Sequence, residues 1–222
     1  DYIYQSISYL VFVPEMERLF QASPSFRRNF LDRLIYSSKN DYNKLINKYK
    51  KLLVERTKLL QQNTADNDWL KYIEQEIGYL GLEIYQIRYT QLDYINNNLN
   101  ILKKNNKFQF DVELKIVDDY FNTGIILEEY LTSLQKFRVY DRQFGGAKIG
   151  PHKSDIVATI NNDFNASLLS TGQQKTVVLM ILLAECYHLI NNKNINPILL
   201  FDEIGSHLDN HNRQILLNMI NG

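Results

Sequence analysis

A short, wholly apolar run near the end of the chain leads directly into two adjacent carboxylates. Residues 198–201 read Ile-Leu-Leu-Phe, and Asp202 and Glu203 follow. Such a run is typical of a strand buried on both faces of a parallel sheet, with ligand-binding groups at its carboxyl end. An aspartate there can hold Mg²⁺ through water, and a following glutamate can act as general base on an attacking water. By itself, the pattern fits equally a strand that ends at a helix N-cap.

A second polar motif precedes a strongly apolar helix, which we predict over residues 172–190. The motif reads Ser170-Thr-Gly-Gln-Gln-Lys, and Gly172 allows a ligand to approach the backbone closely. The Ser170 hydroxyl, the unpaired N–H groups and the positive end of the helix dipole can together bind an anion. On pattern alone, an ordinary serine N-cap with a glutamine nearby explains these residues as well.

The order and spacing of these motifs favour one shared function. The chain contains, in order, the Ser-x-Gly-Gln start, an apolar helix, a short loop with Pro197, the strand ending in Asp-Glu and the segment Ser206-His-Leu-Asp209. This order closely resembles the ABC ATPase family, in which the three motifs are the signature, Walker B and the D-loop. In that family the signature of one head completes the nucleotide site of its partner. The resemblance implies ATP and Mg²⁺ as cofactors and an ATP-dependent homodimer.

The resemblance also implies a role for each motif residue. Three residues would contact the γ-phosphate in trans or support that contact, namely Ser170, Gly172 and Gln173. Asp202 would serve Mg²⁺, and Glu203 would be the catalytic base. Asp209 would help to order the dimer interface.

Three further motifs make the resemblance more specific. Gly150-Pro-His-Lys-Ser-Asp155 resembles the Gly-Pro-His-Arg-x-Asp motif of RecF proteins, with Lys153 in place of arginine. Phe12-Val-Pro-Glu15 and residues 23–32 resemble that family's Pro-Glu segment and its Ser-Pro-x-x-Arg-Arg-x-Phe-Leu-Asp segment. RecF proteins are slow, DNA-stimulated ATPases of DNA repair. The resemblance implies that the partners are double-stranded and gapped DNA and the proteins RecO and RecR. Together with RecO and RecR, the family promotes loading of the RecA recombinase.

The fold class that follows is α/β plus α, the C-terminal part of an ABC-type ATPase lobe with an inserted helical arm. We expect the end of the N-terminal part of that lobe in residues 1–14, the arm (lobe II) in residues 15–135 and the ATPase core in residues 136–222. Alternating β-branched and aromatic residues up to residue 13 predict a strand. Ser23 or Ser25 is expected to cap the next helix, and Asp41 to open a longer one.

A heptad seam marks the helix after the break at residues 63–67. Its apolar residues recur at alternating steps of three and four, at Leu70, Ile73, Ile77, Leu80, Ile84 and Ile87. This helix should pack lengthwise against a neighbour, with Gly78 and Gly81 weakening it locally. An antiparallel pair within the chain is favoured over an intermolecular coiled coil, which is usually longer.

The remaining elements are predicted from shorter patterns. Alternation over residues 108–114 predicts a strand, and residues 119–140 have a helical pattern. Residues 144–168 are β-rich, with a strand at 155–160 and a hairpin turn at 161–163. Residues 211–220 are expected to form a final helix.

Five basic residues inside the family motifs are candidates for DNA contacts, namely Arg18, Arg27, Arg28, Lys148 and Lys153. An alternative for Arg27 and Arg28 is that they tie the arm to the ATPase lobe by ion pairs. Because 25 Lys and Arg balance 25 Asp and Glu, any basic surface must be local. His152 is expected to fix the turn after Pro151.

A Walker A motif, G-x-x-x-x-G-K-[ST], does not occur in the sequence, and the chain begins with Asp1. We therefore expect a fragment that does not hydrolyse ATP alone, with Walker A lying upstream. The alternatives are a helical adaptor derived from an ATPase, or another SMC-type or transport head. Cys186 is expected to be a buried, inert thiol. No apolar run spans a bilayer, so no membrane partner and a cytoplasmic location are expected.

Overall fold

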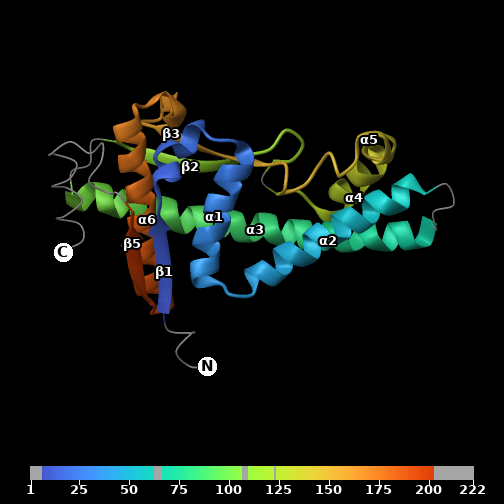
Figure 1. The fold of residues 1–222 in the computed structure, drawn as a ribbon, viewed down its shortest axis with the longest axis horizontal. Coiled ribbons are helices and arrows are strands. Elements are labelled where there is room, and N and C mark those ends of the chain that lie inside the picture. Colours follow the sequence, from blue (N-terminus) through green and yellow to red (C-terminus); the bar gives the residue numbers. More distant parts are fainter. Residues whose placement is uncertain (1–6, 63–66, 107–109, 123, 203–222) are drawn as a thin grey trace.

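The computed structural model describes residues 7–62, 67–106, 110–122 and 124–202. Figure 1 shows a small parallel sheet at one end of the molecule and a helical arm that projects from it toward the other end. A forty-residue helix runs through both regions. The predicted final helix at residues 211–220 and the break at 63–66 lie outside the described residues.

Strands β1 (Ile7–Phe12) and β5 (Asn196–Phe201) form the parallel pair, with Ile7 opposite Asn196 and Phe12 opposite Phe201. The parallel strand before Asp202 is therefore confirmed. Its expected burial on both faces is wrong for the described residues, because Ile198 and Leu200 are 50% and 49% exposed. One face of the pair packs on helix α6, whereas no described element covers the other.

Two segments link β1 to the arm. The 3-10 segment η2 (Pro14–Gln21) follows β1, and helix α1 (Pro24–Ser38) begins after Ser23. The Ser23 hydroxyl accepts a hydrogen bond from the Phe26 amide at 3.3 Å, so Ser23 is the N-cap. Helix α1 then packs against β1, α3 and α6 and leads into the arm.

The arm is an antiparallel pair of helices, α2 (Tyr42–Gln61) and α3 (Asn67–Asn106). The seam is confirmed, because Leu70, Ile73, Ile77 and Ile84 are buried. Helix α2 supplies the matching face, and the predicted pairing within one chain is confirmed. Beyond the seam, α3 continues and packs on α6, so one rigid element joins the arm to the sheet region.

Helices α4 (Leu127–Lys136) and α5 (Arg138–Phe144) pack on the arm. The helix predicted at residues 119–140 therefore begins later, is interrupted at Phe137 and ends later. Gly124 has a φ of +95°, a conformation that does not belong to an α-helix. Gly78 and Gly81 lie within continuous helix α3, where a Cβ would meet side chains of α4. Their absent side chains allow α4 to approach closely.

A three-stranded antiparallel sheet covers the junction between arm and α6. It consists of β2 (Val112–Val117), β3 (Asp155–Ile160) and β4 (Phe164–Asn165) in that order. The predicted hairpin turn is confirmed, with Asn161 and Asn162 at φ of +51° and +57°. The strand predicted at residues 108–114 begins at Val112 instead. A short turn, η3 (Ala166–Leu168), leads to α6 (Thr171–Lys193).

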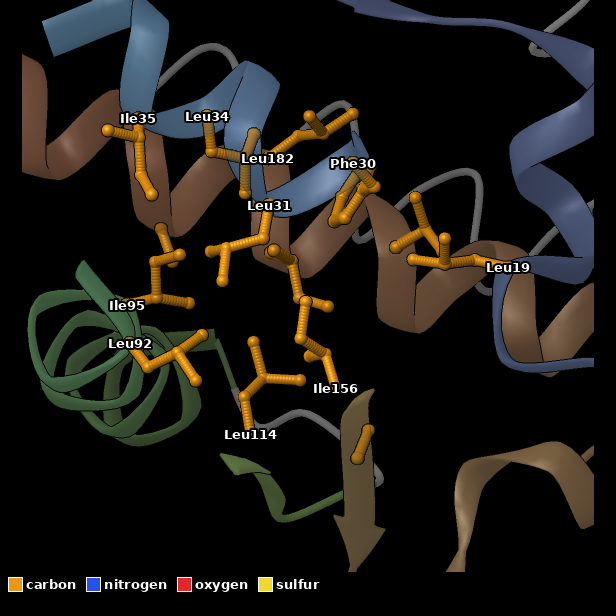
Figure 2. Close-up of a cluster of buried hydrophobic side chains, with 14 of the residues drawn as sticks. Leu19, Phe30, Leu31, Leu34, Ile35, Leu92, Ile95, Leu114, Ile156 and Leu182 are labelled. Atoms are coloured by element: carbon orange, nitrogen blue, oxygen red, sulfur yellow. The ribbon is translucent and has the colours of Figure 1, made fainter. Parts of the chain in front are cut away.

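One hydrophobic core joins these elements. Figure 2 shows side chains from η2, α1, α3, α6, β2 and β3 meeting in it, among them Leu19, Leu31, Leu34, Leu92, Ile95, Leu114, Ile156 and Leu182. Each fully buried side chain of this size contributes about 1.5–3 kcal/mol to folding. Residues of the predicted arm and of the predicted ATPase core share this cluster, and the two domain boundaries stay predictions. Cys186 is buried as expected. Across the described ranges, no helix has the length and apolar character to cross a membrane.

Candidate functional site

The motif at the start of α6 forms a capping box. Ser170 Oγ accepts from the Gln173 amide at 3.4 Å, and Gln173 Oε1 accepts from the Ser170 amide at 3.0 Å. Ser170 itself is exposed. The first N–H groups of a helix have no partner within it, so this turn presents donors and a positive dipole end toward solvent. Gly172 lies within the same first turn.

Buried contacts hold this turn rigidly against the end of β1. Lys175 Nζ, which is fully buried, pairs with Glu17 Oε1 at 2.6 Å and lies 5.5 Å from the centre of the Phe12 ring. Gln174 Nε2 donates to the Leu169 carbonyl at 3.0 Å. An orientation fixed in this way suits a group that must meet a ligand on another molecule, because little entropy is lost on binding.

Asp202 follows β5 at the carboxyl end of the parallel pair. Its amide donates to the Phe12 carbonyl at 3.0 Å, and its side chain is exposed. Glu203 and Asp209 lie outside the described residues. No cluster of three or more metal-binding side chains occurs in the described part of the chain, and the Mg²⁺ role of Asp202 stays a prediction.

Ser170 and Asp202 lie at the same end of the molecule without touching. Helix α6 has 23 residues and is antiparallel to the six-residue β5, to which it connects through Asn194 in a left-handed conformation. The helix therefore extends about 34 Å from this connection and the strand about 20 Å. Ser170 therefore lies further from this connection than Asp202 does, and no contact between the two residues is described.

The Gly-Pro-His-Lys-Ser-Asp segment joins α1 and α3 to β3. Arg88 Nη1 donates to the Pro151 carbonyl at 2.6 Å, and Arg28 Nη1 donates to the Ser154 carbonyl at 2.5 Å. Arg27 pairs with both carboxylate oxygens of Asp155, at 2.8 and 2.6 Å. The Arg27–Asp155 contact is an ion pair of the kind that the structural alternative requires, whereas the Arg28 contact is a hydrogen bond to a backbone carbonyl.

The other basic candidates are distributed over two regions. Arg18 is exposed on η2. Lys148 and Lys153 line one cleft beside α5, so the structure brings these two residues together. The side chain of Arg18 has no described contact with that cleft.

His152 is a partly buried residue that links the segment to the arm. Its Nδ1 lies 2.9 Å from Tyr49 Oη, and its Nε2 lies 2.9 Å from the Ala147 carbonyl. Tyr49 Oη in turn lies 3.0 Å from Tyr130 Oη. Burial lowers the pKa of His152 to about 4, and the nearby charges of Lys153 and two arginines act in the same direction.

This shift predicts acid sensitivity that His152→Gln removes. Between pH 6.5 and about 4 the unfolded chain holds a proton on His152 that the folded chain does not, so stability falls as the pH falls through that window. The wild-type chain should lose about 2 kcal/mol more than the variant between pH 7 and pH 5. Urea unfolding at both pH values measures the difference.

Comparing the stability of the wild-type chain with that of the variant separates the effect of His152 from that of Glu185, whose pKa shift acts in the opposite direction. Burial raises the pKa of Glu185 to about 8, which makes its contribution decline with rising pH, and this contribution is common to both proteins. Parallel pH profiles for the two chains would contradict the prediction.

Several buried charged residues were not identified from the sequence. Arg56, Glu74 and Asp141 form a buried cluster, and Arg88 pairs with Asp32 at 3.0 Å. One signal was available for Arg56, because Tyr42, Tyr49 and Arg56 are spaced by seven residues and therefore share one face of α2. A charge at a seam position indicates a buried partner on the facing helix.

Comparisons with known proteins agree with this geometry. No family model matches the chain. The chain is 35% identical over 211 residues to the DNA replication and repair protein RecF of Rickettsia prowazekii (strain Madrid E) and 34% identical over 215 residues to that of Rickettsia massiliae (strain Mtu5). Each match covers 94% of this chain. A solved structure of the recombination mediator protein RecF with ATP, of the RecFOR pathway, superposes with a TM-score of 0.78 at 25% identity over 96% of the chain.

A second solved RecF structure, with ATPrS, also has a TM-score of 0.78, at 24% identity, and supports the fold. The chain spans 59% of the length of each of the two curated relatives and of the two solved chains. Matches over nearly the whole chain, in sequence and in fold, show that this chain belongs to the RecF family.

Proposed function

We propose that this chain is the signature-bearing part of an ATP-dependent, dimerising DNA clamp that acts in recombinational repair. The relatives are DNA replication and repair proteins, and the solved neighbours hold ATP or ATPrS. The clamp would bind double-stranded and gapped DNA and promote RecA loading with RecO and RecR. ATP and Mg²⁺ would be bound between two protomers.

The observation that supports this proposal most strongly is the exposed capping box at Ser170, held by the buried Lys175–Glu17 pair. An ordinary helix cap has no need of a charged pair beneath it. Here the pair fixes the direction of the first-turn N–H groups before any ligand arrives. This preorganisation is what a trans contact to a phosphate requires.

Each residue then has a distinct task. Ser170 Oγ accepts from the Gln173 amide, which leaves its hydroxyl proton available to donate to a γ-phosphate oxygen of the partner's nucleotide. The Gly172 amide adds a donor from the same turn, and Gln173 keeps Ser170 in place. Asp202 would hold a water molecule bound to the Mg²⁺ of its own protomer, and Glu203 would accept the proton of the attacking water.

The substitution Ser170→Arg tests the proposal in the full-length protein, meaning this chain within a polypeptide of its relatives' length. An arginine adds bulk and places a cation at the positive end of the α6 dipole. We expect the dissociation constant of the ATP-dependent dimer to rise at least about 100-fold, which corresponds to about 2.7 kcal/mol. Sedimentation with and without ATP measures this.

The matched control is Ser23→Arg, which makes the same change at the exposed N-cap of α1. Both variants lose about 1 kcal/mol of capping, but Ser23→Arg should retain the dimer. A normal ATP-dependent dimer with Ser170→Arg would remove the signature from the interface. A wild-type protein without any ATP-dependent dimer would instead favour a helical adaptor.

A further inference from the structure

A cleft of about 310 Å³ beside α5 combines exposed aromatic rings with lysines. Tyr140 and Phe144 lie four residues apart on α5, with ring centres 4.5 Å apart and ring planes inclined by 35°. They are 41% and 64% exposed, although the apolar face of a helix is ordinarily buried. Tyr120 enters the cleft from the loop after β2. These rings offer a stacking surface to a ligand.

The lysines of the cleft are held close to the rings. Lys148 Nζ lies 5.1 Å from the centre of the Tyr140 ring and 5.9 Å from that of Tyr120. The Lys148 amide donates to the buried Asp141 carboxylate at 2.8 Å, which fixes its backbone. Lys153 lines both this cleft and an adjoining one that contains Lys58. Two lysines therefore lie beside the aromatic surface.

The loop at Gly145 and Gly146, beside the cleft, leaves space for a ligand. Gly145 and Gly146 have φ of +75° and +74°, and a Cβ at either position would meet nothing within 4 Å. Backbone of another chain can therefore pass close to this loop.

Acidic groups that also line the cleft distinguish between classes of ligand. Asp118 is engaged by Tyr85 Oη and by the amides of Tyr120 and Phe121, at 2.5–3.2 Å. Asp119 lines the cleft as well and is exposed. Carboxylates repel a phosphate or an acidic peptide inside the cleft, but they accept hydrogen bonds from the amino groups of a base.

We propose that this cleft binds an unpaired base of single-stranded DNA, an inference that rests on the DNA-binding function proposed above. Tyr140 and Phe144 stack on the base, and Asp119 accepts from its amino group. Lys148 and Lys153 contact the flanking phosphates at the rim. The cleft thus provides selectivity for a gap over continuous duplex, because only a gap offers bases with exposed faces.

The test compares two DNAs with the full-length protein and ATP, one a duplex with a short single-stranded gap and the other fully paired. Tyr140→Leu/Phe144→Leu should weaken binding to the gapped DNA roughly tenfold and leave duplex binding unchanged, because stacking on aromatic side chains is lost. Tyr72→Leu/Tyr79→Leu is the matched control, since these exposed tyrosines lie on α3 outside the cleft. Its gapped-to-duplex affinity ratio should equal that of the wild type.

A salt titration provides a second readout. Lys148→Gln and Lys153→Gln should each reduce the salt slope of gapped-DNA binding by about one. The wild-type affinity for duplex reports on the proposed function, whereas the gapped-to-duplex ratio reports on the cleft. Equal losses on both DNAs, or no loss on either, would overturn the base site while leaving the clamp intact. A wild-type protein that binds neither DNA would overturn both proposals.

Discussion

Replacing Arg56 by methionine is expected to lower the free energy of unfolding of the chain by about 3–5 kcal/mol. Globular proteins are stable by only about 5–15 kcal/mol, so this single change removes a large part of the total. Urea denaturation followed by circular dichroism measures it. The expected size comes from the charges that the arginine leaves behind.

Arg56 lies at the centre of a buried network that joins four helices. Its Nε pairs with Glu74 Oε1 at 3.0 Å, its Nη1 with Asp141 Oδ2 at 2.6 Å, and its Nη2 donates to the Leu134 carbonyl at 2.8 Å. All three charged side chains are almost fully buried. Arg138 also pairs with Glu74, at 2.5 Å. Without Arg56, Glu74 keeps its pairing with Arg138, whereas the buried Asp141 carboxylate loses the arginine with which it pairs.

The neighbouring arginine provides the matched control. Arg138 is 26% exposed on its side chain and pairs with Glu74 alone among the network's acids, so Arg138→Met should cost clearly less than Arg56→Met. In a chain that also carries Glu74→Gln and Asp141→Asn, Arg56→Met should become much cheaper, because no stranded carboxylate remains. An equal cost in both backgrounds would show that Arg56 contributes by packing rather than by charge.

The difference between local and long-range contacts explains which parts of the fold could be predicted from the sequence. The seam of α3 and the apolar helix α6 have regular spacing, and local spacing is what periodicity detects. The partners of Arg56 lie 18 and 85 residues away, and no local pattern encodes such pairings. The exposure of Ile198 and Leu200 could not be predicted for a similar reason, because the sequence of a strand does not determine how many elements pack on it.

The same distinction between local and long-range contacts applies to the candidate site. Ser170 and Gln173 are three residues apart, so their capping box could be predicted from the sequence. The Lys175–Glu17 pair that steadies it spans 158 residues and could not. The cleft at Tyr140 was also missed, because Tyr120 and Lys148 meet there from separate loops. Chemistry that depends on adjacent residues is visible in a sequence, and chemistry that depends on tertiary contacts is not.

Replacing Gly150 by alanine should destabilise the chain by about 3–5 kcal/mol, combining steric overlap with backbone strain. Gly150 has a φ of +122°, which L-residues rarely adopt. A Cβ there would fall inside van der Waals contact with the hydroxyl oxygens of Tyr130 and Tyr49 and would lie 3.2 Å from His152 Nδ1. The two tyrosines are fully buried. Burial restricts how far they can move aside.

A rescue experiment separates the two causes. Tyr49→Phe/Tyr130→Phe removes both hydroxyl groups that the new Cβ would strike, so Gly150→Ala should cost less in that background by about 1–3 kcal/mol. The part that remains measures the strain at φ of +122°. Gly145→Ala is the control for strain alone, because its φ is +75° and its Cβ would meet nothing within 4 Å. If Gly150→Ala cost no more than Gly145→Ala, the close packing of the two tyrosine hydroxyls would not be the reason for glycine in this motif.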